Sequence, residues 1–209
     1  MARTRIKICG VTRENDAVRA AELGADLVGL NFWPGSPRCL EVAAATQIAE
    51  RVRERVKLVG VFVNQPPAQI QEISDCVGLD LLQFHGDENP GSVRSFGDRA
   101  IKAFRVGADF DAAVLGDFSD AWGYLFDCDH PTLFGGSGVT WPYERVAGLS
   151  REKPVIVAGG LRPSNVLQAI ARSGADIVDV SSGIESQPGI KDPELMRRFI
   201  REVHDAEEE

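Results

Sequence analysis

The sequence has no long apolar run and no excess of basic residues. None of its apolar stretches approaches the ~20 residues that a membrane-spanning helix needs, and the opening MARTRIKICG has no signal-peptide core. Lysine and arginine number 23 against 31 aspartate and glutamate, and the net charge of −8 argues against nucleic acid, whose phosphates bind clustered cations. We therefore expect a cytoplasmic protein that binds neither nucleic acid nor membranes. Binding of a small anion remains compatible with this net charge, because backbone N–H groups and one or two arginines can bind phosphate within an acidic protein.

Cysteine and histidine are too few and too scattered to organise the fold or a metal site. The four cysteines contain no C-x-x-C pair, and their spacing suits neither zinc coordination nor a disulfide scaffold of the secreted type. The three histidines lie far apart, at positions 85, 130 and 204. We therefore expect free thiols and no metal site.

What the sequence does contain is a regular alternation of β-rich and helical segments. Segments with apolar residues at helical spacing separate the β-rich runs. Two junctions between a helix and the next strand, ELGADLVGL and RSGADIVDV, have similar sequences. The β-rich runs occupy residues 5–9, 26–32, 57–63, 79–84, 100–104, 123–127, 154–158 and 176–180.

Strand followed by helix, repeated about eight times, predicts parallel strands joined by crossover helices. An open doubly wound sheet and a closed barrel both fit, but the count of eight and the absence of G-x-G-x-x-G after the first run favour the barrel. We predict an α/β fold, a single-domain (β/α)8 TIM barrel over residues 1–209, with residues 203–209 as a frayed acidic tail. Catalytic groups of such barrels collect where the strands end.

Glycine-rich turns follow the last two β-rich runs. AGGL at 158–161 contains Gly159 and Gly160, and SSGI at 181–184 contains Ser182 and Gly183. Because glycine lets backbone N–H groups approach an anion, and because these loops are a common phosphate site in barrels, we predict a phosphate site here. The alternative is that both segments are tight turns between strand and helix that bind no ligand. GGSG at 135–138 would add a donor or act as a lid.

Two groups at strand ends are candidates for acid–base chemistry. Asp127 ends the sixth run, where partial removal from water favours a protonated carboxyl and thus a general acid; a helix cap or a surface ion pair is the alternative. Cys9 ends the first run on the same face as Lys7, whose ammonium would lower the pKa of the thiol toward neutrality. The alternatives are that Cys9 packs in the core and that Lys7 pairs with an inward carboxylate such as Asp179.

Two further side chains are candidates for binding. Arg38 lies in the loop NFWPGSPRCL, which two prolines stiffen, and a guanidinium so presented suits a planar carboxylate ligand. The alternative is that Arg38 is solvated and binds no ligand, as is usual for an arginine in a loop. His85, in QFHG, could bind substrate or shuttle a proton, and one histidine at a strand end does not decide between these roles.

Motifs spread along the chain resemble those of the phosphoribosylanthranilate isomerases of tryptophan biosynthesis. The K-I-C-G start, the F-x-P-x-S-x-R loop and the final D-V-S-S-G are specific in combination, although no single one is. The matching segments are KICGVT at 7–12, GADLVGLNFWPGSPR at 24–38, VGVFVN at 59–64, LQFHGDE at 82–88, FD at 126–127, GGSG at 135–138, AGGL at 158–161 and DVSSGIE at 179–185.

The resemblance implies a (β/α)8 barrel that uses no metal or organic cofactor. It implies conversion of N-(5-phosphoribosyl)anthranilate to 1-(2-carboxyphenylamino)-1-deoxyribulose 5-phosphate, an Amadori rearrangement from aldose to ketose. Asp127 would protonate the furanose ring oxygen, and Cys9, as a thiolate, would remove the C2 proton. Arg38 would bind the anthranilate carboxylate, and Asp179 would lie near the sugar hydroxyls. The phosphate would bind at Gly159, Gly160, Ser182 and Gly183.

The chain departs from the family after the sixth run. VTWPY stands where members often have an aromatic–acidic–Trp pattern, so we expect Pro142 to start the next helix differently, and the shape of a lid over 128–141 is left open. Cys128 replaces a residue that is often Thr or Ser, and we expect it to point away from Asp127 and to pack.

Other functions are also compatible with a phosphosugar barrel. The histidine-pathway ribonucleotide isomerase normally has an aspartate at the position of Cys9, and indole glycerol phosphate synthase uses lysine–glutamate pairs that these strand ends lack. A barrel that binds a phosphorylated ligand without catalysis is the alternative of a different class. The sequence shows no interface patch that distinguishes a monomer from a homodimer, and both occur in the family.

Overall fold

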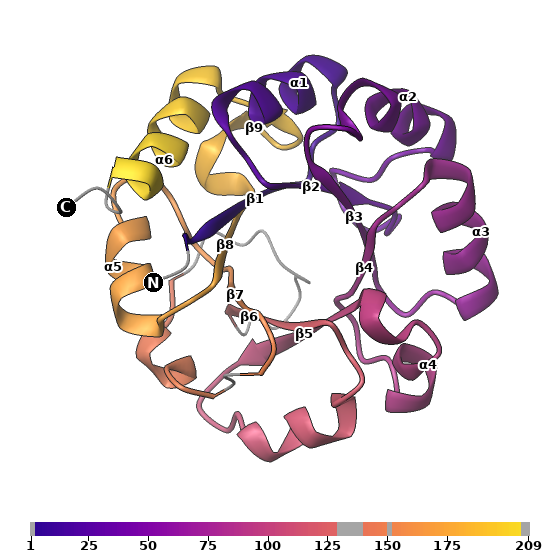
Figure 1. Cartoon of the computed structure of the whole chain (residues 1–209), viewed down its shortest axis with the longest axis vertical. Helices are drawn as coiled ribbons and strands as arrows, with labels where there is room; N and C mark the ends of the chain where they lie inside the picture. The colour runs from indigo at the N-terminus through magenta and orange to yellow at the C-terminus, as the bar shows by residue number, and fades with distance from the viewer. Residues whose placement is uncertain (1–2, 129–139, 150–151, 206–209) are drawn as a thin grey trace.

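Eight parallel strands form a closed barrel in chain order in the computed structural model, which describes residues 3–128, 140–149 and 152–205 (Figure 1). The predicted (β/α)8 barrel is therefore confirmed. Pairing of the first strand with the last closes the barrel. The strands are β1 (Arg5–Cys9), β2 (Leu27–Asn31), β3 (Lys57–Phe62), β4 (Leu81–Phe84), β5 (Ala100–Val106), β6 (Gly123–Cys128), β7 (Val155–Val157) and β8 (Ile177–Val180).

Helices surround the barrel, but two connections lack an α-helix within the described ranges. β5 is followed by the 3-10 helix η2 (Ala112–Phe118) and β6 by η3 (Tyr143–Val146), so the expected eight crossover helices are only partly present. Short 3-10 turns η1 (Gly97–Arg99) and η4 (Ser182–Ile184) and a hairpin of β9 (Glu185–Gln187) and β10 (Ile190–Lys191) complete the fold. The α-helices are α1 (Glu14–Leu23), α2 (Val42–Val52), α3 (Pro67–Val77), α4 (Pro90–Arg94), α5 (Val166–Ser173) and α6 (Pro193–Asp205).

The apolar core has two layers, as the alternation of side chains along each strand requires. An inner cluster, which includes Leu27, Ile101 and Ile177, fills the barrel, and a larger cluster lies between the barrel and the helices. Cys128 belongs to the outer cluster. Its predicted packing role is therefore confirmed.

The repeated Gly-x-Asp joint ties neighbouring strands together. Three helices end on a glycine with φ between 67° and 98°, the left-handed conformation that glycine adopts without strain: Gly24, Gly78 and Gly174. Two residues later an aspartate accepts a backbone N–H near the start of the preceding strand, with N–O distances of 2.7–2.8 Å: Asp26 from Ile6, Asp80 from Leu58 and Asp176 from Val155. The similar junctions seen in the sequence thus share one hydrogen-bonding arrangement, which occurs at these three helix-to-strand junctions.

The two ends of the described chain meet beside α6. Arg3 Nη1 lies 2.8 Å from His204 Nε2, and α6 packs against both α1 and α5. Val203 is buried and α6 continues to Asp205, so the frayed tail expected from residue 203 is wrong for residues 203–205. Residues 206–209 lie outside the described part of the chain.

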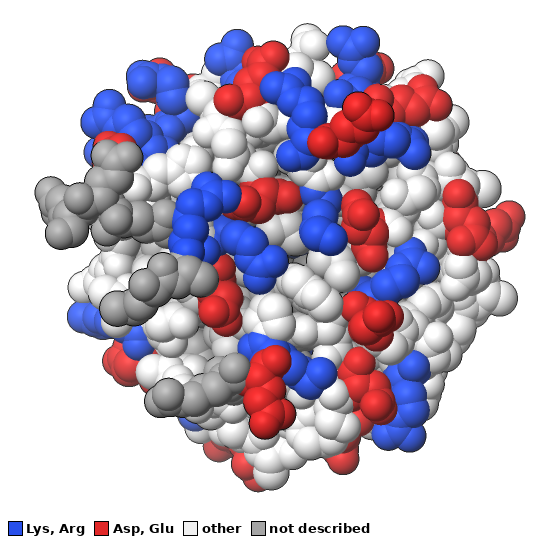
Figure 2. Space-filling model, in the orientation of Figure 1, with Lys and Arg blue, Asp and Glu red and all other residues white. Residues whose placement is uncertain are grey.

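Charges of both signs are interspersed over the face of the molecule seen in Figure 2. Among the described residues, no helix is both long and apolar enough to cross a membrane.

We predict that Asp176→Ala lowers the free energy of unfolding by about 1 kcal/mol, because the Val155 N–H loses its acceptor. Asp176→Asn keeps an acceptor oxygen and is expected to lose less. Urea unfolding followed by circular dichroism measures both variants, and equal losses would contradict a role for this hydrogen bond.

Candidate active site

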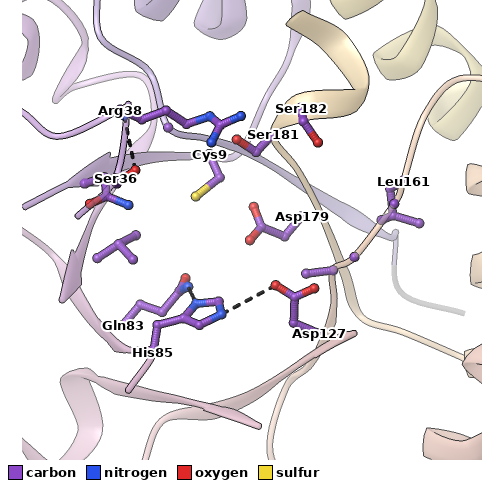
Figure 3. Close-up of a pocket in the computed structure, with 16 residues that line it drawn as sticks. Cys9, Ser36, Arg38, Gln83, His85, Asp127, Leu161, Asp179, Ser181 and Ser182 are labelled. Atoms are coloured by element: carbon purple, nitrogen blue, oxygen red, sulfur yellow. Dashed lines mark hydrogen bonds and ion pairs between the residues drawn. The ribbon is translucent and has the colours of Figure 1, made fainter. Parts of the chain in front are cut away.

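The predicted site residues gather in one pocket at the C-terminal ends of the barrel strands. Figure 3 shows Cys9, Arg38, His85, Asp127 and Asp179 directed toward a common space. They come from β1, the loop after β2, the end of β4, β6 and β8. The pocket is also lined by Gly159, Gly160 and Ser182, but Gly183 is not among its lining residues.

Lys7 lies beneath the pocket with its ammonium group completely buried. Its Nζ donates to Asp179 Oδ2 at 3.0 Å and to Gln83 Oε1 at 2.8 Å. Burial alone lowers the pKa of Lys7, but the Asp179 carboxylate and Cys9 together raise it above its ordinary value. Lys7 is therefore a charged group inside the barrel, and its proposed pairing with Asp179 is confirmed.

Cys9 lies on the same inward face as Lys7, half-buried in the pocket. The expected lowering of its pKa is wrong: burial of the thiolate and the negative charge of Asp179 raise the pKa of Cys9 and outweigh the opposing effect of Lys7 and Lys191. On the neighbouring strand, an added Cβ at Gly29 would lie 2.8 Å from Cys9 Sγ and 3.3 Å from Lys7 Cε. Gly29 therefore makes the room for these two side chains.

Arg38 is largely buried and is held by a carboxylate that the sequence analysis did not single out. Its Nε and Nη2 donate to Glu185 at 2.9 and 2.7 Å, and Lys191 Nζ donates to Glu185 Oε1 at 2.7 Å. Burial tends to raise the pKa of Glu185, but these hydrogen bonds and charges lower it. The glycine after Cys9 makes room for the arginine, because at Gly10 (φ 67°) an added Cβ would lie 2.4 Å from Arg38 Cδ. Arg38 is therefore positioned before any ligand binds.

Asp127 is buried at the end of β6 and makes contacts through both oxygens. Oδ1 accepts the backbone N–H of Cys128 at 2.7 Å, and Oδ2 lies 3.4 Å from His85 Nε2. An added Cβ at Gly159 would lie 2.7 Å from Asp127 Oδ1. The glycine turn after β7 therefore also makes room for this carboxyl.

The turns after β7 and β8 present backbone groups to the pocket. Gly159 and Gly160 have φ of 84° and 65° in succession. Within the described ranges, no group accepts a hydrogen bond from the backbone N–H of Gly159, Gly160 or Ser182. Gly183 also lets the two turns pack closely, since an added Cβ there would overlap the Leu161 carbonyl oxygen.

The segment that follows β6 is attached to the β7 turn by two aromatic side chains. Trp141 Nε1 donates to the Ala158 carbonyl at 2.9 Å, and the Tyr143 hydroxyl donates to the Gly159 carbonyl at 2.7 Å. Pro142 directly precedes η3, so a 3-10 turn begins here at Tyr143. The GGSG motif at 135–138, and with it most of the predicted lid, lies outside the described residues.

The chain was compared with known proteins. Residues 6–202 match the family model of N-(5'phosphoribosyl)anthranilate (PRA) isomerase. The chain belongs to this family. It is 46% identical to the N-(5'-phosphoribosyl)anthranilate isomerase of Azotobacter vinelandii over 99% of this chain and 100% of that protein.

Solved structures of PRA isomerases have the same fold. The enzyme from Thermotoga maritima superposes with a TM-score of 0.88 at 33% identity, covering 97% of this chain and 99% of that one. A further PRA isomerase structure, solved with reduced 1-(o-carboxyphenylamino)-1-deoxyribulose 5-phosphate, gives a TM-score of 0.82 at 34% identity, covering 97% of this chain and 99% of that one. The family resemblance read from the motifs is thus confirmed.

We predict that alkylation of Cys9 by iodoacetamide rises with pH along a curve whose midpoint lies above that of the exposed Cys76. Asp179→Asn should shift the Cys9 midpoint to lower pH, because it removes the negative charge that disfavours the thiolate. Mass spectrometry of the modified peptides gives both curves. A Cys9 midpoint below that of Cys76 would contradict the electrostatics described here.

Proposed function

We propose that this chain isomerises N-(5'-phosphoribosyl)anthranilate to 1-(2-carboxyphenylamino)-1-deoxyribulose 5-phosphate in tryptophan biosynthesis, without a cofactor. One observation carries the proposal: in a chain of the PRA isomerase family, a thiol and a carboxyl face one pocket that backbone N–H groups border on one side. An aldose-to-ketose rearrangement needs one proton delivered and another removed, and a pocket with two such groups suits it.

Asp127 acts as the general acid that opens the sugar ring. It transfers its proton to the furanose oxygen while the bond from that oxygen to C1 breaks and the aniline nitrogen lone pair forms a C=N bond to C1. The result is an open-chain protonated Schiff base and an Asp127 carboxylate. The N–H groups of Cys128 and His85 that face Oδ1 and Oδ2 stabilise the negative charge left behind.

Cys9 acts as the general base in the second step. Its thiolate takes the proton from C2, the electron pair left behind forms a C1=C2 bond, and the C=N electron pair returns to the aniline nitrogen. The protonated Schiff base thus becomes a neutral enolamine that tautomerises to the aminoketose. The raised pKa of Cys9 makes the thiolate a strong base, and the Lys7 and Lys191 ammonium groups are the charges that favour its formation. Cys9 on β1 and Asp127 on β6 are separated by β7 and β8, which lets them flank one sugar.

Other pocket groups hold the ends of the substrate. Arg38 binds the anthranilate carboxylate through Nη1, which makes no hydrogen bond within the described part of the chain. The turns containing Gly159, Gly160, Ser182 and Gly183 bind the phosphate, and Gly183 also supports their close packing. Asp179 Oδ1, a buried oxygen for which the described residues supply no hydrogen-bond donor, accepts a sugar hydroxyl.

The localisation and the oligomeric state are proposed from the same family relationship. We propose a cytoplasmic enzyme that is a monomer or a homodimer. Both states are documented for a relative: the T. maritima PRA isomerase is described as dimeric, and monomers generated from it have been solved, with a TM-score of 0.81 to this chain at 33% identity.

We predict that Cys9→Ser and Asp127→Asn each slow turnover by about 10²–10⁴-fold, because each removes one proton-transfer group. Loss of the fluorescence of phosphoribosylanthranilate, followed without added metal, measures the rate, and circular dichroism checks that each variant folds. Cys76→Ser and Asp120→Asn are matched surface controls. Rates near wild type in both site variants would refute the assigned roles, and binding without any fluorescence loss by the wild type would indicate a non-catalytic barrel.

We also predict that Arg38→Ala raises KM by about 10-fold or more, the loss expected for a charge-assisted hydrogen bond. Arg51→Ala, which removes an exposed arginine, is the control. Steady-state kinetics over a range of substrate concentrations separates KM from kcat. An unchanged KM would remove Arg38 from the binding site.

A further inference from the structure

A chain of polar contacts runs across the floor of the pocket from Asp179 to Asp127. Lys7 donates to Asp179 Oδ2 and to Gln83 Oε1. Gln83 Nε2 lies 2.7 Å from His85 Nδ1, and His85 Nε2 lies 3.4 Å from Asp127 Oδ2 (Figure 3). All five side chains are buried, with exposed fractions of at most 8%. The two aspartates at the ends of this series of contacts have roles in the proposed mechanism, whereas Gln83 in the middle has none.

The direction of each hydrogen bond follows from the ammonium group of Lys7. An ammonium group only donates, so the oxygen of the Gln83 amide must face Lys7 and its NH2 group must face His85. The NH2 group also only donates, so His85 Nδ1 must accept and carries no proton. The remaining ring proton is then on Nε2, the nitrogen that faces Asp127.

A neutral imidazole is what a general acid at Asp127 requires beside it. A positive charge within about 4–6 Å stabilises a carboxylate and weakens its hold on a proton by about 10- to 1,000-fold. An imidazolium at His85 would therefore deprive Asp127 of the proton that ring opening uses. A neutral ring with its proton on Nε2 still donates a hydrogen bond to the carboxylate that forms after the transfer.

We propose that Gln83 is a positioning residue that holds His85 as the neutral Nε2–H tautomer, so that His85 contacts Asp127 without placing a positive charge beside it. The proposal rests on the proposed function of Asp127 as the general acid. β4 makes the arrangement possible, because Gln83 and His85 are two residues apart and so point to the same side of the strand, into the barrel.

The test combines histidine spectroscopy with single-turnover kinetics. Long-range ¹⁵N–¹H spectra of the ¹⁵N-labelled protein at pH 7.5 show which ring nitrogen of each histidine carries the proton. The chain has only three histidines, and His85→Asn assigns the signals of His85. Single-turnover loss of phosphoribosylanthranilate fluorescence, with enzyme in excess, measures the chemical step.

We expect wild-type His85 to be the neutral Nε2–H tautomer and Gln83→Glu to add a proton at Nδ1 and so form an imidazolium, because a carboxylate only accepts hydrogen bonds and its negative charge favours a cation beside it. The single-turnover rate of Gln83→Glu should fall by about 10- to 100-fold with KM within about threefold, as expected when the acid loses its proton to a nearby positive charge. Gln83→Met, which fills the space without polar groups, should show mixed tautomers and a smaller loss. Gln71→Glu makes the same charge change on the exposed surface of α3 and should change neither readout.

Three results would overturn the proposal: a proton on Nδ1 in wild-type His85, an unchanged protonation state of His85 in Gln83→Glu, or a changed protonation state with an unchanged single-turnover rate. If Gln83→Glu does not fold, the wild-type spectrum and Gln83→Met decide the same question. Failure of the proposed function gives a different result, since the wild type would then leave the fluorescence unchanged while the spectra still report the tautomer of His85.

Discussion

The buried ammonium group of Lys7 is the constraint on which the floor of the pocket depends. Removing an ion from water costs several kcal/mol unless partners replace the lost hydration, and the barrel supplies these partners from two other strands, as Asp179 on β8 and Gln83 on β4. Since Lys7 can only donate, it determines how each partner is oriented. The order of the polar side chains from β8 to β6 follows from that one charge.

In the ion pairs around Cys9, the cations outnumber the carboxylates that they contact. Lys7, Lys191 and Arg38 are three cations, and Asp179 and Glu185 are two carboxylates, so one positive charge is left over. A thiolate at Cys9 or the carboxylate of a ligand at Arg38 would balance it. The pocket is thus suited to anions even though the whole chain carries a net charge of −8, because affinity for a small ligand depends on the local field rather than the total charge.

Much of the fold could be predicted from the sequence, since each barrel strand is a short apolar run and the runs end on polar or glycine residues. The exceptions have local causes: in the described residues, the connections after β5 and β6 contain 3-10 turns and no α-helix, and Pro142 directly precedes the second of these turns. Period-two alternation in LQFHG could have pointed to Gln83, because it shares a strand face with His85. No such signal marks Lys191.

The rest of the site could not be predicted because it depends on distance and burial. Glu185 contacts Arg38 only because the chain after β8 folds back toward the loop after β2. The pKa of Cys9 was predicted to fall because Lys7 is its neighbour in the strand, whereas desolvation and Asp179 decide the sign in three dimensions. Gly183 was predicted to bind phosphate, and its close approach to Leu161 is visible only in the folded chain.

The pairing of β1 with β8 has a consequence for how the enzyme is made. Lys7 and Asp179 are 172 residues apart in the sequence and meet only at this seam. During synthesis, β1 leaves the ribosome with one edge unpaired and with a lysine whose carboxylate partner is missing until residue 179 has emerged. Closure of the barrel and formation of the Lys7–Asp179 pair are therefore the same event, and a chain that stops before β8 has neither.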